Sequence, residues 1–424
     1  MYQTFALKGD IIFSETPQKL AVSPAHYAIC ENGVCTGVFA DLPASFAEIP
    51  VMDYSDKLII PGLVDLHAHA PQYAFRTLGM DLELLDWLNT QTFPQEARYA
   101  DLDYARRAYS IFTDDLWRSA TTRAVLFGTL HVPATLMLMQ MLEQSGLETL
   151  VGKVNMDRNS PDDLCEADPK TSLDATRAWL EQCREFKHCR PILTPRFLPS
   201  CSDALMEGLH ALQKETGLPV QSHLSENQGE IAWVQELCPK SSGYGDAYDQ
   251  FGMFGGAGCP TIMAHCVWSD AEERARMKQN GVFIVHCPQS NVNLSSGVAP
   301  VRTYLDEGLS IGLGSDIAGG AHLSILRAMA DAVQASKLRW RLFDQTVSPI
   351  TLPEAFWMGT RGGGAFFGKV GAFEPGFAFD AIILDDRDLP SPLTLTPEER
   401  LTRLIYLTDD RAVVHKYVNG HKLF

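Results

Sequence analysis

Five residues of types that bind transition metals are spread along the chain: His67, His69, His223, His265 and Asp316. Each lies at or just beyond the end of a short apolar run that is typical of a buried strand. In a barrel of parallel strands, the carboxyl ends of the strands meet at one face and build the active site there. A lone H-x-H pair is more often incidental than metal-binding. The shared placement of all five residues nevertheless predicts one metal centre.

The H-x-H pair suits that prediction because alternate side chains of a strand share a face. The imidazoles of His67 and His69 can therefore reach the same ion. Neutral imidazole and carboxylate ligands suit zinc or iron, and a catalytic zinc keeps one position open for water. We expect one Zn²⁺ per chain, with Fe²⁺ as the alternative. The spacing leaves open whether His265 binds the ion or orients a hydroxide.

Glu226 follows His223 by three residues, in the sequence HLSE. If His223 ends a strand, Glu226 lies on the next loop, over the open coordination position. A carboxyl group there can relay a proton from water to a substrate. The alternative is a glutamate at a helix start that complements the helix dipole, which is common. Asp316 could have two roles, binding the ion and taking a proton from the water.

Eight apolar segments separated by helical patterns must position these residues. The count predicts a (β/α)8 barrel of the TIM type, within the α/β class. Amphipathic stretches such as residues 203–217, which close at Gly217, are expected to be the intervening helices. The strand candidates are 58–67, 121–129, 149–156, 190–197, 218–224, 261–266, 282–287 and 309–316.

The two ends of the chain have a different pattern, in which short apolar runs alternate with turns. Residues 1–57 and 369–424 are expected to form one small β domain beside a barrel of residues 58–368. The C-terminal part is expected to end as a hairpin turning at Asn419-Gly420.

Composition excludes several classes of partner. The chain of 424 residues has 35 Lys and Arg against 52 Asp and Glu, a net charge of −17, so binding to nucleic acid or an anionic membrane surface is not expected. No apolar stretch approaches the ~18 residues of a membrane span, and the first residues do not resemble a signal peptide. Ten cysteines without a framework spacing favour reduced thiols and a cytoplasmic location.

Two other motifs have weaker interpretations. The segment CREFKHC, with Cys183, His188 and Cys189, could hold a second zinc, but its charged setting favours an exposed helix end. The segment GLGSDIAGG resembles a phosphate-binding glycine loop. Its Asp316 follows the strand directly, which does not fit a dinucleotide fingerprint.

Several sequence blocks together resemble the guanine deaminase family of the amidohydrolase superfamily. The H-x-H, His, His, Asp set is common to the superfamily, whereas HAPQYAF, LTPRF and SHLSEN are more specific to guanine deaminases. The resemblance runs from about residue 58 to the C-terminus. The blocks are PGLVDLHAHAPQYAF, LLDWLNTQTFPQEARY, VGKVNMDRNSP, LTPRFLPSCS, QSHLSENQGEI, MAHCVWSDAE, HCPQSNVNLSSG and GLGSDIAGG.

The resemblance implies a homodimer that converts guanine and water to xanthine and ammonia in purine catabolism. It implies zinc ligands at His67, His69, His223 and Asp316, with Glu226 and Asp316 as proton carriers. It further implies that Gln72, Arg196 and Phe197 contact the base, together with His223, Glu226 and Asp316. This is chemically sensible, because an arginine fork can engage the O6 and N7 acceptors of guanine and an aromatic ring can lie on its face. Taken alone, however, a surface arginine and a core phenylalanine are the commoner interpretations.

Two alternatives remain at this point. One is a sister amidohydrolase acting on another azaheterocycle, such as an oxidised guanine or a triazine. The other is a scaffold protein that kept the barrel and lost catalysis. The complete ligand set argues against the scaffold, because a degenerate site should have lost at least one ligand. The segment SATTRAV departs from the run closer to GTTTA that relatives often carry, which concerns packing rather than chemistry.

Overall fold

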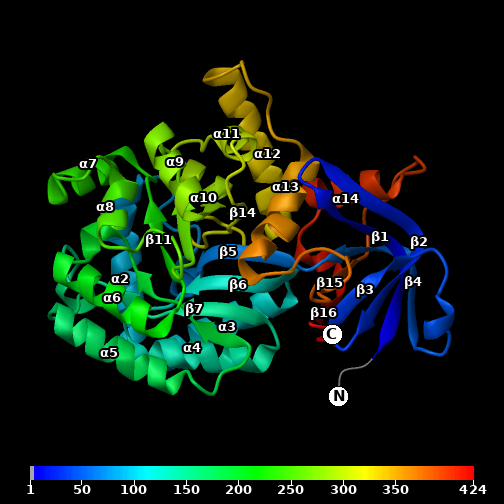
Figure 1. The fold of residues 1–424 in the computed structure, drawn as a ribbon, viewed down its shortest axis with the longest axis horizontal. Helices are drawn as coiled ribbons and strands as arrows, with labels where there is room; N and C mark the ends of the chain where they lie inside the picture. The colour runs from blue at the N-terminus through cyan, green and yellow to red at the C-terminus, as the bar shows by residue number, and fades with distance from the viewer. Residues whose placement is uncertain (1–3) are drawn as a thin grey trace.

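Parallel strands form a closed barrel in the larger part of the computed structural model, which describes residues 4–424 (Figure 1). Hydrogen bonding divides the barrel into a sheet ordered β5-β6-β7-β9, a sheet ordered β11-β12-β13-β14 and the short pair β8-β10. The strands are β5 (Leu63–His69), β6 (Thr121–Phe127), β7 (Glu148–Gly152), β8 (Val154–Asn155), β9 (Cys189–Pro191), β10 (Thr194–Pro195), β11 (Val220–Leu224), β12 (Thr261–His265), β13 (Phe283–His286) and β14 (Ile311–Leu313).

Two contacts close the circle of strands. A parallel bridge between Leu193 and Val220 joins the two larger sheets on one side. On the other side, the amide N of Asp316 donates to the carbonyl O of His67 at 2.8 Å, directly at the candidate metal cluster. Every residue of β5 and β6 is buried, as expected for strands covered on both faces. The expectation of a (β/α)8 barrel is confirmed.

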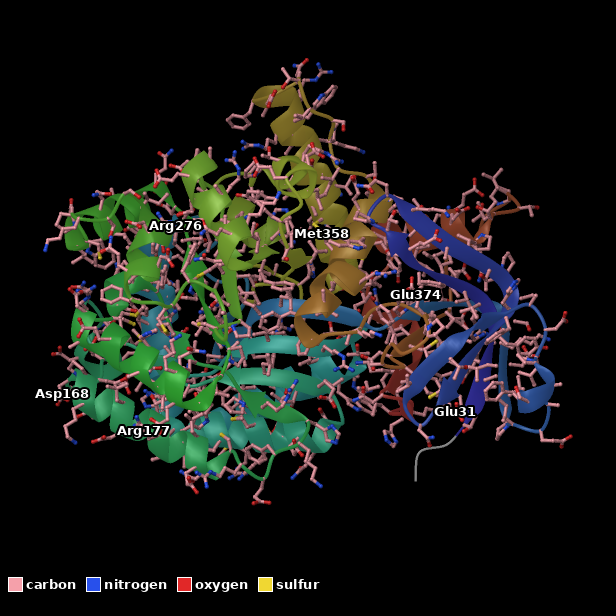
Figure 2. All side chains as sticks on the ribbon, viewed as in Figure 1. Glu31, Asp168, Arg177, Arg276, Met358 and Glu374 are labelled. Carbon is pink, nitrogen blue, oxygen red and sulfur yellow. The ribbon has the colours of Figure 1, made fainter. Side chains whose placement is uncertain are left out.

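Helices surround the barrel, and their exposed faces are charged, as the side chains of Asp168 and Arg177 at its rim illustrate (Figure 2). The helix expected over 203–217 is present: Ser202 caps its start, and Gly217 ends it in the left-handed conformation with φ 68°. The surrounding helices are α3 (Leu102–Arg118), α4 (Val132–Ser145), α5 (Pro169–Gln182), α6 (Asp203–Thr216), α7 (Gln228–Leu237), α8 (Tyr244–Gln250), α9 (Ala271–Asn280), α10 (Pro288–Asn293), α11 (Val301–Asp306), α12 (Ile325–Leu342) and α13 (Leu352–Trp357).

Both ends of the chain contribute to a second, seven-stranded sheet, drawn in blue, orange and red in Figure 1, with helix α14 (Pro397–Leu407) beside it. Its order is β17-β16-β15-β4-β1-β2-β3, and the last two strands form the hairpin expected at Asn419-Gly420. The strands are β1 (Phe5–Thr16), β2 (Lys19–Glu31), β3 (Val34–Phe39), β4 (Val51–Pro61), β15 (Ala381–Leu384), β16 (Val413–Val418) and β17 (His421–Lys422).

The junction between the sheet and the barrel differs from the expectation in one respect. Residues 58–61, expected to begin the first barrel strand, belong to β4, which pairs with β15 in register from Leu58–Leu384 to Pro61–Ala381. The barrel strand β5 begins only at Leu63. One apolar run thus passes through both sheets, and its pattern does not reveal where the chain leaves the first for the second.

Buried charges join the two parts. Arg123 of β6 donates through Nε to Asp380 Oδ2 at 2.7 Å and through Nη2 to Asn419 Oδ1 at 2.7 Å. Lys416 of β16 donates to three carbonyl oxygens of the barrel part, those of residues 116, 117 and 121. None of the helices within residues 4–424 has the length and hydropathy that a membrane crossing requires.

Candidate active site

The five predicted metal-binding side chains converge at the carboxyl ends of the barrel strands. Their donor atoms form two groups, His67 with His69 and His223, and His67 with His265 and Asp316. Within each group the donor atoms lie within 4.8 Å of one another, and His67 belongs to both. Strands that are far apart in the sequence, β5, β11, β12 and β14, therefore bring together one cluster of four imidazoles and a carboxylate.

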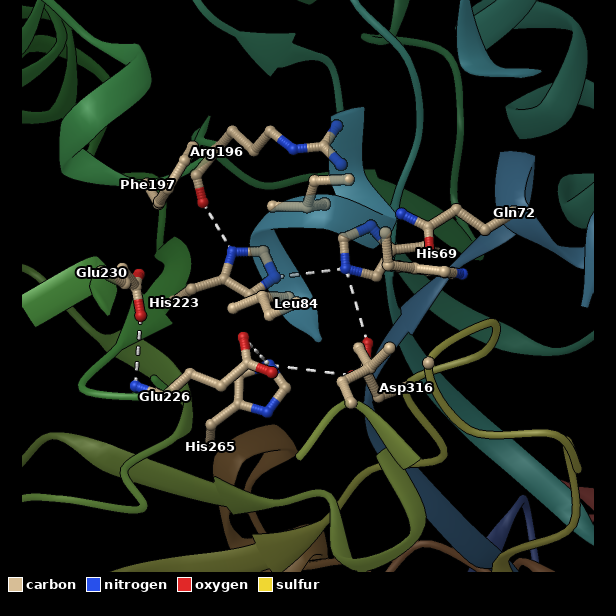
Figure 3. A pocket seen from close by; sticks show the side chains of 14 residues that line it. His69, Gln72, Leu84, Arg196, Phe197, His223, Glu226, Glu230, His265 and Asp316 are labelled. Carbon is tan, nitrogen blue, oxygen red and sulfur yellow. Dashed lines mark hydrogen bonds and ion pairs between the residues drawn. The ribbon is translucent and has the colours of Figure 1, made fainter. Parts of the chain in front are cut away.

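Hydrogen bonds fix how the imidazoles face one another. Nδ1 of His223 lies 2.6 Å from the carbonyl O of Arg196, which can only accept, so Nδ1 carries the proton. The unprotonated Nε2 of His223 then points at Nε2 of His69, 3.2 Å away (Figure 3). Asp316 Oδ1 lies 3.1 Å from Nε2 of His67 and 3.5 Å from Nε2 of His69. Donor atoms converging in this way fit a bound cation.

The protonation states of the cluster agree with such a cation. Burial lowers the pKa of His67, and it lowers the pKa of His69 and of His223 well below the ordinary range, so these imidazoles are neutral. Burial alone would raise the pKa of Asp316, but His67 and the other imidazoles beside it hold that pKa below its usual value. Neutral imidazoles and an ionised carboxylate are the forms that bind metal. Apart from the contact of Nε2 with Asp316, the buried ring nitrogens of His67 have no partner among residues 4–424, which a role as metal ligand would explain.

The backbone at the strand ends is held in an uncommon conformation. Four non-glycine residues, Ser225, His265, Cys266 and Asp316, have positive φ angles of 47°, 73°, 48° and 44°. Such angles are costly for residues with a Cβ and cluster at functional sites. Gly314 lies beside these residues. A Cβ at this position would come within 2.9 Å of His67 Cβ, so only glycine permits the close packing of β14 on β5.

Glu226 faces the cluster across from Asp316. Its Oε2 lies 3.4 Å from Nε2 of His265, and its Oε1 accepts a hydrogen bond from Ser296 Oγ at 2.9 Å. Burial raises the pKa of Glu226 to about 7, close to the value that suits a group exchanging protons at neutral pH. Helix α7 begins two residues later and is capped by Asn227, with Glu230 completing the capping box, so Glu226 is not the capping residue.

His265 lies between two carboxylates. Burial would lower its pKa, but Glu226 and Asp316, with the hydrogen bond that His265 donates to Asn291, raise it above the ordinary value. Nδ1 of His265 lies 2.9 Å from Asn291 Oδ1, and Nε2 lies 3.7 Å from Asp316 Oδ2. An imidazole in this position can hold a proton beside both carboxylates.

A cavity opens from the cluster and contains every other predicted site residue (Figure 3). Gln72 follows β5, whereas Arg196 and Phe197 follow β10, and all three side chains line the cavity. Leu84, Trp87, Leu88 and Leu294 supply apolar walls. Polar groups at two ends and apolar walls between them suit a flat heterocycle.

Two carboxylates of this cavity region were not found from the sequence, Glu230, which lines the cavity, and Glu96. Glu96, in helix α2 (Phe93–Ala97), is buried and accepts hydrogen bonds from Arg196 Nη1 at 2.5 Å and Nη2 at 3.1 Å. It also accepts from Gln72 Nε2 at 2.8 Å. The block LLDWLNTQTFPQEARY contains Glu96, and that block was the available signal. Asn291 and Ser296, which hold His265 and Glu226, were also missed, although the block HCPQSNVNLSSG contains both.

The two weaker motifs of the sequence do not form sites of their own. Cys183 and Cys189 are buried rather than exposed, and His188 is paired with Glu148 at 2.8 Å. These three residues form no metal-binding group within residues 4–424. The glycine-rich segment places Asp316 in the histidine cluster instead of forming a phosphate loop.

Comparison with known proteins gives the family. Residues 58–423 match the model of the amidohydrolase family. The chain belongs to this family. Amidohydrolases are metal-dependent, in agreement with the histidine and aspartate cluster.

Individual relatives of the amidohydrolase are similar over most of their length. The guanine deaminase of Dictyostelium discoideum is 38% identical over 382 residues, 88% of this chain and 84% of the relative. That of Escherichia coli K12 is 33% identical and covers 89% of this chain and 85% of its own. The guanine deaminase from C. acetobutylicum, whose crystal structure has guanine bound in the active site, is 46% identical in sequence. Its structure superposes with a TM-score of 0.96, and the match covers 99% of this chain and all of that one.

Proposed function

We propose that this amidohydrolase converts guanine and water to xanthine and ammonia, as part of purine catabolism. The observation that carries the proposal is the shared cavity: Arg196 and Phe197 face the same space as Glu226 and the histidine cluster. A guanidinium fork at one end suits the O6 and N7 acceptors of guanine, and the other end offers the groups that hydrolysis requires. The similarity to proteins named guanine deaminase supports the same activity.

His67, His69, His223 and Asp316 would hold the metal, and we propose zinc, with Fe²⁺ as the alternative. When bound, the ion supplies Lewis acidity, which makes water acidic enough to act as a nucleophile at neutral pH. We assign His265 a hydrogen-bonding role, because Glu226 and Asp316 lie on both sides of it and favour its protonated form. His265 would therefore orient the attacking oxygen by donating a hydrogen bond.

Glu226 would carry the protons of the reaction. It would take one from water as the oxygen attacks C2 of guanine and deliver it to the adjacent ring nitrogen. Asp316 would accept the second proton of the water. Transfer of this proton to the 2-amino group would let the C2–N bond break and ammonia leave. Its pKa of about 7 lets Glu226 both accept and donate at neutral pH. Arg196 and Gln72 would hold the far edge of the base, and Phe197 would lie against its face.

A purine panel tests this function directly. Purified, zinc-loaded protein should release ammonia from guanine with xanthine as the product, and adenine should be a poor substrate because its amino group is on C6. Faster hydrolysis of an oxidised guanine or of a triazine would assign the protein to a sister activity. No ammonia from any of these compounds would favour a scaffold without catalysis. Metal analysis of dialysed active protein should give about one ion per chain, and chelation should abolish turnover.

We also propose a homodimer in a reducing, cytoplasmic compartment. The end of α12 supports a second copy as partner, because Leu338, Leu342 and Phe343 are exposed there by 53%, 71% and 67%. Light scattering of the wild type should give a mass twice that of one chain. In Leu342→Glu the measured mass should fall to that of a single chain. The ten cysteines carry free thiols, which fits a reducing compartment.

A further inference from the structure

Glu96 has no part in the proton transfers proposed above, yet it is among the most completely engaged carboxylates near the cavity. Both its oxygens are used: Arg196 donates to each of them, and Gln72 donates to Oε1. Its side chain and that of Arg196 are each 3% exposed. A buried carboxylate is costly unless charges and hydrogen bonds compensate it, so this arrangement requires Arg196 to remain beside it.

The pairing also decides which donors of Arg196 remain for a ligand. Glu96 takes one N–H from each terminal nitrogen, and no residue within 4–424 accepts from Nε. A guanidinium has five N–H donors, so the edge formed by Nε and Nη2 still offers two parallel donors. The guanidinium also lies 5.1 Å from the centre of the Phe93 ring, one turn before Glu96 in the same segment.

Gln72 is fixed in the same way. Its Nε2 donates to Glu96, and its Oε1 accepts from the amide N of Ala318 at 3.2 Å. These two bonds set the orientation of the amide, leaving one N–H and one oxygen lone pair for a ligand. Glu96 therefore orients both polar groups of this end of the cavity.

The charge of Glu96 has a second consequence. Arg196 and Glu96 together carry no net charge, so this end of the cavity offers donors without an uncompensated cation. A neutral purine can use those donors, whereas an anionic purine meets a buried carboxylate within the same hydrogen-bonded group. Like charges at short range in a buried site repel strongly.

We propose that Glu96 is a positioning residue that presents Arg196 and Gln72 to neutral purines and selects against anionic ones. The proposal rests on the proposed function and deepens it, because xanthine, the product, loses a ring proton more readily than guanine does. Selection against the anion would favour release of product over its retention. It would equally exclude urate, which is an anion at neutral pH.

The test compares a neutral and an anionic purine that are not substrates. Dissociation constants of hypoxanthine and of urate are measured by calorimetry on zinc-loaded protein at pH 7.5, for wild type, Glu96→Gln and Arg196→Gln. We expect the ratio of the urate constant to the hypoxanthine constant to fall by about tenfold or more in Glu96→Gln, since a charge-assisted hydrogen bond to the freed arginine is worth that much. In Arg196→Gln the ratio should rise, because Glu96 is then uncompensated.

Glu354→Gln is the matched control. Glu354 is equally buried and is held by both terminal nitrogens of Arg302, at 2.8 and 2.6 Å, but Arg302, unlike Arg196, does not line the cavity. The ratio of urate to hypoxanthine dissociation constants in Glu354→Gln should equal that of the wild type. In the same preparations, Glu96→Gln should raise KM for guanine by a larger factor than it lowers kcat.

Equal ratios in wild type and Glu96→Gln, with normal zinc content, would overturn the proposal. If Glu96→Gln does not fold, the measurement on Arg196→Gln tests the proposal alone. A ratio of urate to hypoxanthine dissociation constants that does not rise in Arg196→Gln would then overturn the proposal. Absence of guanine turnover in wild type, with the ratios shifting as expected, would refute the proposed reaction and leave the selection against anions standing.

Discussion

Three side chains of the site, those of His223, His265 and Glu226, are each oriented by a residue outside the metal cluster. The carbonyl of Arg196 fixes the proton of His223, Asn291 holds His265, and Ser296 holds Glu226. Partners of this kind set ligand orientation and tautomer. The side chains therefore have their working orientation before a substrate enters.

Glu226→Gln should remove most turnover. Glutamine keeps the size of the side chain and can bond to Ser296, but it cannot accept and return a proton, so kcat should fall by ~100- to 10,000-fold. Activity is measured with guanine, alongside zinc content and hypoxanthine binding, and both of these should remain near wild type. A variant with a nearly normal kcat would show that Glu226 does not carry the proton.

Arg196→Lys should separate charge from geometry. Lysine can still neutralise Glu96, but an ammonium cannot present two parallel N–H donors to adjacent acceptors. We expect kcat/KM for guanine to fall by about tenfold to a hundredfold, corresponding to loss of one charge-assisted hydrogen bond. Steady-state kinetics measure it, and an unchanged kcat/KM would contradict the role of the arginine edge.

At the scale of elements, the ends of the barrel strands carry the site. The sequence was sufficient to predict this, because buried parallel strands are apolar runs and the residues that follow them, such as His223 and Asp316, stand out by type. Glu96 could not be predicted in the same way. Its partner Arg196 is a hundred residues away, and a glutamate in a short helix is usually exposed to solvent.

The boundary between the sheet and the barrel was missed for a different reason. The apolar run of residues 58–66 is buried in two successive environments, and hydrophobicity reports burial without saying which sheet provides it. Gly62, between β4 and β5, marks the point where the chain changes from one to the other.

Asp380→Asn should weaken the connection between these two elements. The carboxylate of Asp380 is buried against Arg123, and removing one charge leaves the other buried and uncompensated. We expect the free energy of unfolding, measured by urea denaturation, to fall by about 3 kcal/mol. Glu215→Gln, which breaks the exposed pair with Arg177, is the control and should have no measurable effect. Equal stability of both variants would contradict a role for the Arg123–Asp380 pair.

At the scale of the whole molecule, the barrel depends on a sheet to which both ends of the chain contribute. Lys416 is fully buried, and its ammonium donates to three barrel carbonyls, the number of hydrogen atoms it has to give. The C-terminal strands thus contribute three hydrogen bonds to backbone groups of the barrel part.

Lys416→Met should therefore destabilise the entire protein. Methionine fills a similar volume but removes one hydrogen bond from each of the three carbonyls, of which that of Leu116 keeps Ser119 as a donor, at a cost of about 2 kcal/mol. Thermal unfolding followed by calorimetry should show a lower Tm, whereas Lys422→Met, on the exposed strand β17, should unfold like wild type. If the two variants unfold at the same temperature, Lys416 does not join the sheet to the barrel.

The pairing of β4 with β15 also has a consequence for how the protein is made. On the ribosome, residues 58–61 emerge about 320 residues before 381–384, their partners in the sheet. At ~5–20 residues per second, that edge of β4 waits for roughly 15 to 60 s without its neighbour. An unpaired apolar edge is a site of aggregation. Nascent chains of this protein should therefore need a chaperone until the last strands arrive.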